Sequence, residues 1–279
     1  ENLSKAYDTF RVDKISFDLP SGSIMGFVGE NGAGKTTTLK AILNLIKKDG
    51  GTVKLFGKEL EGNEQEIKEQ IGMVMEECFF PFAFKPSEVS LVMRNIFKTW
   101  DEPLFKRYLD KFQLPREKAI KDYSKGMRMK LFISTALAHH PKLLILDEAT
   151  SGLDPIVRNE ILDEFQDFIQ DEQHSILLST HITSDLEKIA DYITFIHQGR
   201  LLYKGTKDHL IDDYGIVKCT KEGLDKLGKE DIKACRNNEF GCEILVSDKR
   251  RFLSKYQGYT VDSATIEQIM LFLTKGEQI

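Results

Sequence analysis

The strongest chemical pattern in the chain is a glycine-rich stretch that ends in a lysine and hydroxyl side chains, at 29–37, which reads GENGAGKTT. Glycines let successive backbone N–H groups face one centre, and a helix that starts there adds the positive end of its dipole. Lys35 can bind the β- and γ-phosphates of a nucleotide through its positive charge and can assist phosphoryl transfer. The hydroxyl of Thr36 can bind Mg²⁺. The pattern predicts that phosphate is bound by Gly29, Asn31, Gly32, Ala33, Gly34, Lys35, Thr36 and Thr37.

A pair of carboxylates follows a second apolar run, 143–146. Asp147 at the carboxyl end of a buried parallel strand is placed to hold Mg²⁺. Its neighbour Glu148 is then placed to take a proton from a water that attacks the γ-phosphate. Acidic residues commonly end strands, so this pair is evidence for a nucleotide site only together with the glycine loop. The two patterns predict nucleoside triphosphate hydrolysis with Glu148 as the general base.

These groups need elements that bring them to one edge of a sheet. An apolar run at 24–28 precedes the glycine loop, and apolar residues recur at helical spacing over 39–46. We expect this helix to reach about Lys48, where two lysines suit the dipole and two glycines follow. The runs at 143–146 and 175–179 predict further strands that are buried on both faces. The order of strand, loop and helix predicts an α/β fold.

Composition divides the chain into a larger and a smaller unit. The stretch 79–138 has helical patterning interrupted by four prolines and predicts a helical insertion. From about residue 215 the sequence becomes a polar mixture with weak strand signals and one convincing helix at 264–274. We therefore expect a nucleotide-binding domain over 1–214 and a small α+β accessory domain over 215–279.

Charge and hydrophobicity exclude several classes of function. The 39 basic and 44 acidic side chains leave a net charge of −5, so no global positive field favours nucleic acid, and we expect no nucleic-acid partner. The longest apolar run, 269–273, is far shorter than the roughly 20 residues of a membrane span. No leader pattern opens the sequence, and its four cysteines lack a C-x-x-C spacing. We therefore expect reduced thiols and a cytoplasmic protein.

Three further motifs carry a family resemblance. The segment 123–127, YSKGM, resembles the signature motif of the ATP-binding-cassette (ABC) ATPases, and 151–154, SGLD, resembles their D-loop. His181, after a serine and a threonine, resembles their switch histidine and is a predicted catalytic residue. The resemblance covers residues 1 to about 210. It implies a P-loop core with an antiparallel β layer and a helical subdomain.

The signature segment also has a physical interpretation. Ser124 is a suitable N-cap for a helix that begins at Lys125, and such a helix start offers N–H donors to an anion. The resemblance implies that Ser124 and Gly126 bind ATP held by a second subunit, expected to be a copy of this chain, with two ATP molecules enclosed head to tail. The segment departs from the common Leu-Ser-Gly-Gly-Gln form at three positions and keeps Ser124 and Gly126.

Further positions of the family have candidate residues in this sequence, and each candidate has an alternative interpretation. Glu76 stands where the family has the Q-loop glutamine. Its carboxylate is a candidate ligand of Mg²⁺, but it also adds negative charge close to the γ-phosphate. The alternative is therefore that Glu76 does not bind the metal directly. Tyr7 resembles the aromatic residue that stacks on adenine, with Phe10 as a competing candidate. The phenylalanines clustered between 79 and 84 lie where the family docks a membrane subunit, and core packing explains them equally well.

The resemblance implies an ATPase that converts ATP and water to ADP and phosphate, with ATP and Mg²⁺ as its cofactors. Such a subunit lies on the inner face of the cell membrane and powers a separate transmembrane permease. The signature form and the C-terminal extension resemble bacterial exporters of the antibiotic- and peptide-resistance type. The alternative is a soluble cassette ATPase that acts as a regulatory or assembly module without a membrane partner.

Overall fold

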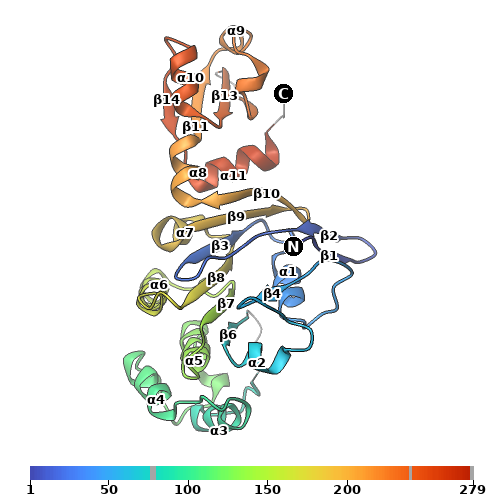
Figure 1. Ribbon diagram of the computed structural model, residues 1–279. Helices are drawn as coiled ribbons and strands as arrows, with labels where there is room; N and C mark the ends of the chain where they lie inside the picture. Colours follow the sequence, from blue (N-terminus) through green and yellow to red (C-terminus); the bar gives the residue numbers. More distant parts are fainter. Residues whose placement is uncertain (76–79, 239–240, 277–279) are drawn as a thin grey trace.

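The computed structural model describes residues 1–75, 80–238 and 241–276, arranged as a broad lower unit and a narrower upper one (Figure 1). The strands of the lower unit are β1 (Leu3–Ala6), β2 (Arg11–Ile15), β3 (Ile24–Val28), β4 (Lys54–Leu55), β5 (Lys58–Glu59), β6 (Ile71–Val74), β7 (Leu143–Asp147), β8 (Ser175–Thr180), β9 (Tyr192–His197) and β10 (Arg200–Thr206). Its helices are α1 (Lys35–Ile42), α2 (Glu64–Lys68), α3 (Pro86–Ile96), α4 (Glu102–Lys111), a 3-10 turn (Ile120–Asp122), α5 (Lys125–Leu137), α6 (Pro155–Phe168), α7 (Thr183–Ile189) and α8 (Lys207–Asp213).

A six-stranded sheet forms the centre of the lower unit, in the order β10-β9-β3-β8-β7-β6. The strands from β9 to β6 are parallel, and β10 pairs antiparallel with β9 through a tight hairpin. Every residue of β3, β7 and β8 is buried, as expected for a parallel sheet covered on both faces. The predicted strands at 24–28, 143–146 and 175–179 are therefore confirmed.

The two faces of this sheet have different covers. Met25 and Phe27 of β3 point to the face that is covered by α1 and by the antiparallel strands, where they join a cluster with Leu39 and Val12. Ile24, on the alternate side of the same strand, joins the cluster formed with α5, α6 and α7. The alternation follows from the two-residue period of a strand. Helices α1 and α5 therefore lie on opposite faces of the sheet.

Helix α1 is shorter than its apolar spacing predicts. It ends at Ile42, and Asn44 adopts a left-handed backbone with φ of 53°. Asparagine tolerates this conformation, which turns the chain out of the helix while the Leu45 N–H bonds the Lys40 carbonyl at 2.8 Å. The expected continuation to Lys48 is wrong.

The helical segment after β6 has a core of its own that includes Val89, Phe105 and Leu131. Asp101 caps α4, since its Oδ1 accepts the Leu104 N–H at 2.7 Å. Helix α5 belongs to both cores, because other residues of this helix pack in the cluster under the central sheet. The segment is therefore joined to the central sheet through α5.

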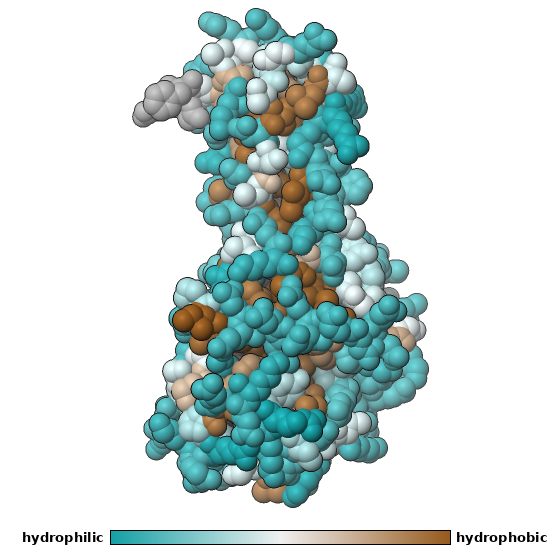
Figure 2. All heavy atoms as spheres, turned by 90° about the vertical axis from the view of Figure 1, so that its left-hand side faces the viewer, coloured by the Kyte–Doolittle hydropathy of each residue, from teal (hydrophilic) through white to brown (hydrophobic). Residues whose placement is uncertain are grey.

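The upper unit is a four-stranded antiparallel sheet in the order β12-β13-β11-β14. Its elements are β11 (Gly215–Cys219), α9 (Lys221–Leu224), a 3-10 turn (Lys229–Asp231), β12 (Ala234–Asn238), β13 (Gly241–Val246), α10 (Lys249–Lys255), β14 (Val261–Ser263) and α11 (Ile266–Lys275). Helix α11 returns to the lower unit, where Ile269 and Phe272 join the cluster under the central sheet. Figure 2 shows apolar residues at the junction of the two units on an otherwise mostly hydrophilic face. Among the described residues, none of the helices is long and apolar enough to span a bilayer.

Candidate active site

Three strands deliver the candidate catalytic groups to one edge of the central sheet. β8 lies between β3 and β7, and all three run in the same direction. The loop 29–34 follows β3, Asp147 and Glu148 stand at the end of β7, and His181 follows β8. Ligand sites in parallel sheets form at this carboxyl edge. The sequence predictions for these groups therefore converge on one place.

The glycine loop is shaped by its left-handed residues. Gly34 has φ of 106°, and a Cβ there would lie 2.9 Å from the Phe10 ring. No other residue type fits this backbone at such a close approach. Helix α1 begins at the next residue, so its N-terminal N–H groups and the positive end of its dipole face the loop.

Lys35 is held in a buried position by the loop that precedes it. Its side chain is 6% exposed, and its ammonium donates to the carbonyls of Gly29 at 2.7 Å and Glu30 at 3.2 Å. The same nitrogen lies 3.2 Å from Glu148 Oε1 in an ion pair. Lys35 thus joins the phosphate-binding loop to the proposed general base.

Asp147 is buried and bonded through both of its oxygens. Its Oδ2 accepts from the Thr36 hydroxyl at 2.7 Å, and its Oδ1 accepts from the Ser179 hydroxyl at 2.7 Å. A hydroxyl and a carboxylate side by side are hard oxygen ligands of the kind that Mg²⁺ binds. Ser179 was not predicted as a site residue, although it stands two positions before the predicted switch histidine.

Glu148 has a backbone conformation that is uncommon for its residue type. Its φ is 53°, while its N–H donates to the Ser179 carbonyl at 2.9 Å. Its Oε2 lies 2.8 Å from His181 Nδ1, within hydrogen-bond distance. Strained backbone of this kind persists where the surroundings fix it, and here it turns the carboxylate toward both Lys35 and His181.

The signature residues lie away from the loop of their own chain. Helix α5 begins at Lys125 as predicted, and Ser124 caps it by accepting the Met127 N–H at 3.2 Å. A Cβ on Gly126 would meet Val157 of α6 at 3.1 Å. Among the residues that the structure describes, no hydrogen bond or ion pair joins Ser124 or Gly126 to residues 29–37 of the same chain, and helices α5 and α1 pack in different clusters.

The two aromatic candidates have different surroundings. Tyr7 is 50% exposed, and the Lys5 ammonium lies 5.5 Å from its ring centre. Phe10 packs instead against Gly34 and the core cluster beside α1. The roles predicted for Tyr7 and Phe10 stay predictions, and Glu76 lies outside the described residues.

A buried charge network behind the D-loop was not predicted. Asp185 of α7 is fully buried and accepts from the Thr150 hydroxyl at 2.7 Å and from Arg158 Nε at 2.5 Å. A buried carboxylate needs such partners. The network ties α6 to α7, and so connects the segment after Glu148 to the helix that follows His181.

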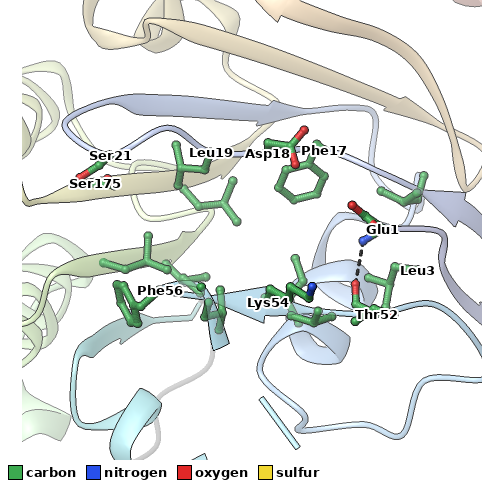
Figure 3. A pocket seen from close by; sticks show the side chains of 18 of the residues that line it. Glu1, Leu3, Phe17, Asp18, Leu19, Ser21, Thr52, Lys54, Phe56 and Ser175 are labelled. Carbon is green, nitrogen blue, oxygen red and sulfur yellow. Dashed lines mark hydrogen bonds between the residues drawn. The ribbon is translucent and has the colours of Figure 1, made fainter. Parts of the chain in front are cut away.

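An apolar groove and a second cavity lie away from the catalytic edge. The larger, about 680 Å³, is an apolar groove between β6, α3 and α5, and its lining includes Leu45, Phe84 and Ile96. Burial lowers the pKa of His139 in this lining to about 4, so its ring is neutral at neutral pH, and it stacks on Phe97. The other, about 380 Å³, lies between the antiparallel strands and the central sheet (Figure 3).

A glycine loop between strand and helix, a buried lysine in that loop, and an Asp-Glu pair at the end of a nearby strand define a P-loop nucleoside triphosphatase. A sequence model for the family described as ABC transporter matches residues 12–151. The chain belongs to the ABC transporter family, as an ATP-binding subunit with ATPase activity. The resemblance to the ABC ATPases is thereby confirmed.

Individual relatives agree with this membership. The bacitracin transport ATP-binding protein BcrA of Bacillus licheniformis is 36% identical over 212 residues, which cover 75% of this chain and 69% of BcrA. The lantibiotic transport ATP-binding protein SrtF of Streptococcus pyogenes is 32% identical and is covered to 90%. A solved ATP-binding subunit of an ABC transporter is 28% identical, with a TM-score of 0.67 over 75% of this chain and 90% of that one.

We expect Lys35→Ala to weaken ATP binding about tenfold to a hundredfold, because charge-assisted hydrogen bonds to the phosphates contribute roughly 1.5–3 kcal/mol each. Calorimetric titration with ATP measures the affinity. Lys40→Ala, on the same helix but outside the loop, is the matched control and should bind ATP normally. Wild-type affinity in Lys35→Ala would place the nucleotide elsewhere.

Proposed function

We propose that this ATPase powers a separate transmembrane permease that exports a peptide-like antibiotic or a related bulky compound. The names of BcrA and SrtF associate those relatives with bacitracin and lantibiotic transport, and this supports an export role here. The subunit would lie on the inner face of the membrane, held there by its permease.

Hydrolysis is assigned to the groups around Glu148. Glu148 accepts a proton from the water that attacks the γ-phosphate, and His181 orients this carboxylate from one side. Lys35 neutralises charge on the β- and γ-phosphates. The oxygens of Thr36 and Asp147 fit Mg²⁺ and would hold it, and the ion supplies further neutralisation of phosphate charge.

The complete ATP site would need two subunits. Ser124 and Gly126 start a helix whose N–H donors suit an anion, yet no hydrogen bond or ion pair among the described residues joins them to the loop of their own chain. A head-to-tail dimer would place each signature against the partner's ATP and create two equivalent composite sites.

The apolar groove is the single observation that carries the permease assignment. Its lining includes the exposed side chains of Leu45, 48% accessible, and Ile96, 58% accessible. Phe80 and Phe84, from the predicted phenylalanine cluster, also line it. An exposed apolar groove of this kind favours an amphipathic helix as its occupant, which a permease would offer from a cytoplasmic loop.

The test pairs two leucines of equal exposure. Leu45→Glu changes the groove, whereas Leu253→Glu changes an equally exposed leucine, 47% accessible, on α10 of the upper unit. Each variant is co-expressed with a candidate permease, and the complex is isolated through a tag on that membrane protein. We expect Leu45→Glu to lower recovery of the ATPase at least tenfold and Leu253→Glu to leave it unchanged.

Soluble ATPase activity in both variants provides the folding control. Equal recovery of the two variants would show that the groove does not bind the membrane partner. Full ATPase activity in a wild-type chain that binds no membrane protein would favour the alternative, a regulatory or assembly module.

A further inference from the structure

A groove beside the switch histidine joins the C-terminal unit to the catalytic edge. It has a volume of about 360 Å³ and lies between α11 and residues 181–184, with Glu30 of the phosphate-binding loop at one end. The wall on α11 is formed by Glu267, Met270, Leu271 and Thr274. These four positions follow the helical spacing of three and four residues, so they make up one face of α11. We call this space the switch groove.

Helix α11 is fixed against the elements that carry the active site. Its opposite face, with Ile266 and Phe272, packs in the same cluster as α7. The Ile266 N–H donates to Glu187 Oε1 of α7 at 3.1 Å, and Lys275 lies 3.9 Å from Glu30. The wall of the groove therefore keeps a defined position relative to both the switch loop and the phosphate-binding loop.

The switch groove combines acidic and apolar character. Glu267 is exposed and makes no ion pair with any residue in the described parts of the chain, and Glu30 adds a second carboxylate. Met270 and Leu271 between them are only half-buried. A complementary surface would carry a cation next to an exposed apolar side chain.

Such a surface exists on the same chain, at the corner where the signature meets the D-loop. Lys125 is exposed, and within the described residues it has no acidic partner. Its ammonium rests over the D-loop, 2.8 Å from where a Cβ on Gly152 would lie. Ile156, in the first turn of α6, is 72% exposed. We call Lys125 and Ile156 the signature corner.

We propose that the switch groove of one subunit receives the signature corner of a second copy when two chains close around ATP. This rests on the proposed head-to-tail dimer, in which Ser124, next to Lys125, faces the partner's phosphates beside His181 and Glu30. Lys125 then meets Glu267 and Glu30 of the partner, and Ile156 packs on its Met270 and Leu271. Two-fold symmetry repeats the contact twice per dimer. The C-terminal unit thereby becomes part of the ATP-dependent interface.

Cross-linking between two differently tagged full-length chains tests the contact. One chain carries Ile156→Cys and the other Leu271→Cys, both with Glu148→Gln to preserve the ATP-bound dimer. A short bis-maleimide should join the two tags with ATP and fail to join them without it. Leu253→Cys replaces Leu271→Cys as the matched control, and a pair of chains without added cysteines reports any background from native thiols.

Charge reversal provides an independent readout. We expect Glu267→Lys to raise the protein concentration needed for ATP-dependent dimerisation about threefold to tenfold, and Lys125→Glu in the same chain to restore it, because both charges then exchange. An ATP-dependent dimer that neither cross-links nor responds to Glu267→Lys would overturn this inference. The proposed head-to-tail dimer would then still stand. Stronger dimerisation of Glu267→Lys would also overturn it, by showing that α11 opposes closure. Absence of any ATP-dependent dimer would reject the head-to-tail arrangement itself.

Discussion

Replacing Glu148 with glutamine is expected to slow ATP hydrolysis by a factor of about 100 or more while ATP binding survives. Glutamine keeps the shape of the side chain and loses the ability to accept a proton from water. Its amide also ends the ion pair with Lys35, 3.2 Å away, which frees that ammonium for phosphate. Steady-state phosphate release and calorimetric titration measure the two quantities separately.

The same variant should reveal the dimer. If hydrolysis normally ends the ATP-bound state, the blocked enzyme keeps its nucleotide, and association is linked to ATP by mass action. We expect light scattering to report a dimer of Glu148→Gln with ATP and a monomer without it. Glu172→Gln, at an exposed loop position, is the control and should hydrolyse ATP normally. Unchanged turnover in Glu148→Gln would remove Glu148 from the role of general base.

The catalytic edge was predictable because its residues lie next to the elements that position them. A glycine loop directly follows a strand, and Asp147 and Glu148 directly end one, so sheet direction alone brings them together. The cap at Ser124 was predictable for the same reason, since capping involves only the next three residues.

Contacts between distant segments were not visible in the sequence. The apolar spacing predicted a longer α1. Ile46 does pack against the core, as the spacing implies, but Asn44 adopts a left-handed backbone and the helix ends before Ile46. Spacing reports which side chains are buried and not whether the backbone stays helical between them. The network of Asp185, Thr150 and Arg158 spans 35 residues and has no local pattern.

The C-terminal helix shows the same limit. The sequence predicted a helix over 264–274, and α11 occupies Ile266–Lys275 with one apolar face. The pattern does not say which surface covers that face. In the structure Phe272 packs in the cluster under the central sheet, which brings Glu267 beside the switch histidine.

Ser124→Arg is expected to lower ATP hydrolysis about a hundredfold or more while a single chain still binds ATP. The arginine adds bulk where the partner's γ-phosphate would lie, whereas Lys35 and Thr36 of its own chain are untouched. Loss of the cap on α5 costs about 1 kcal/mol of stability, and Ser124→Ala controls for that loss because it removes the cap without adding bulk. Phosphate release and calorimetric titration of the monomer measure the two effects.

Mixing Ser124→Arg with an excess of Lys35→Ala should restore part of the activity. The mixed dimer has one composite site in which the first chain supplies an intact loop and the second an intact signature. Rescue requires that one complete site is enough, so the binding result is the more direct measurement. If a folded Ser124→Arg monomer loses ATP binding, the signature serves the site of its own subunit. That outcome would reject the two-subunit ATP site.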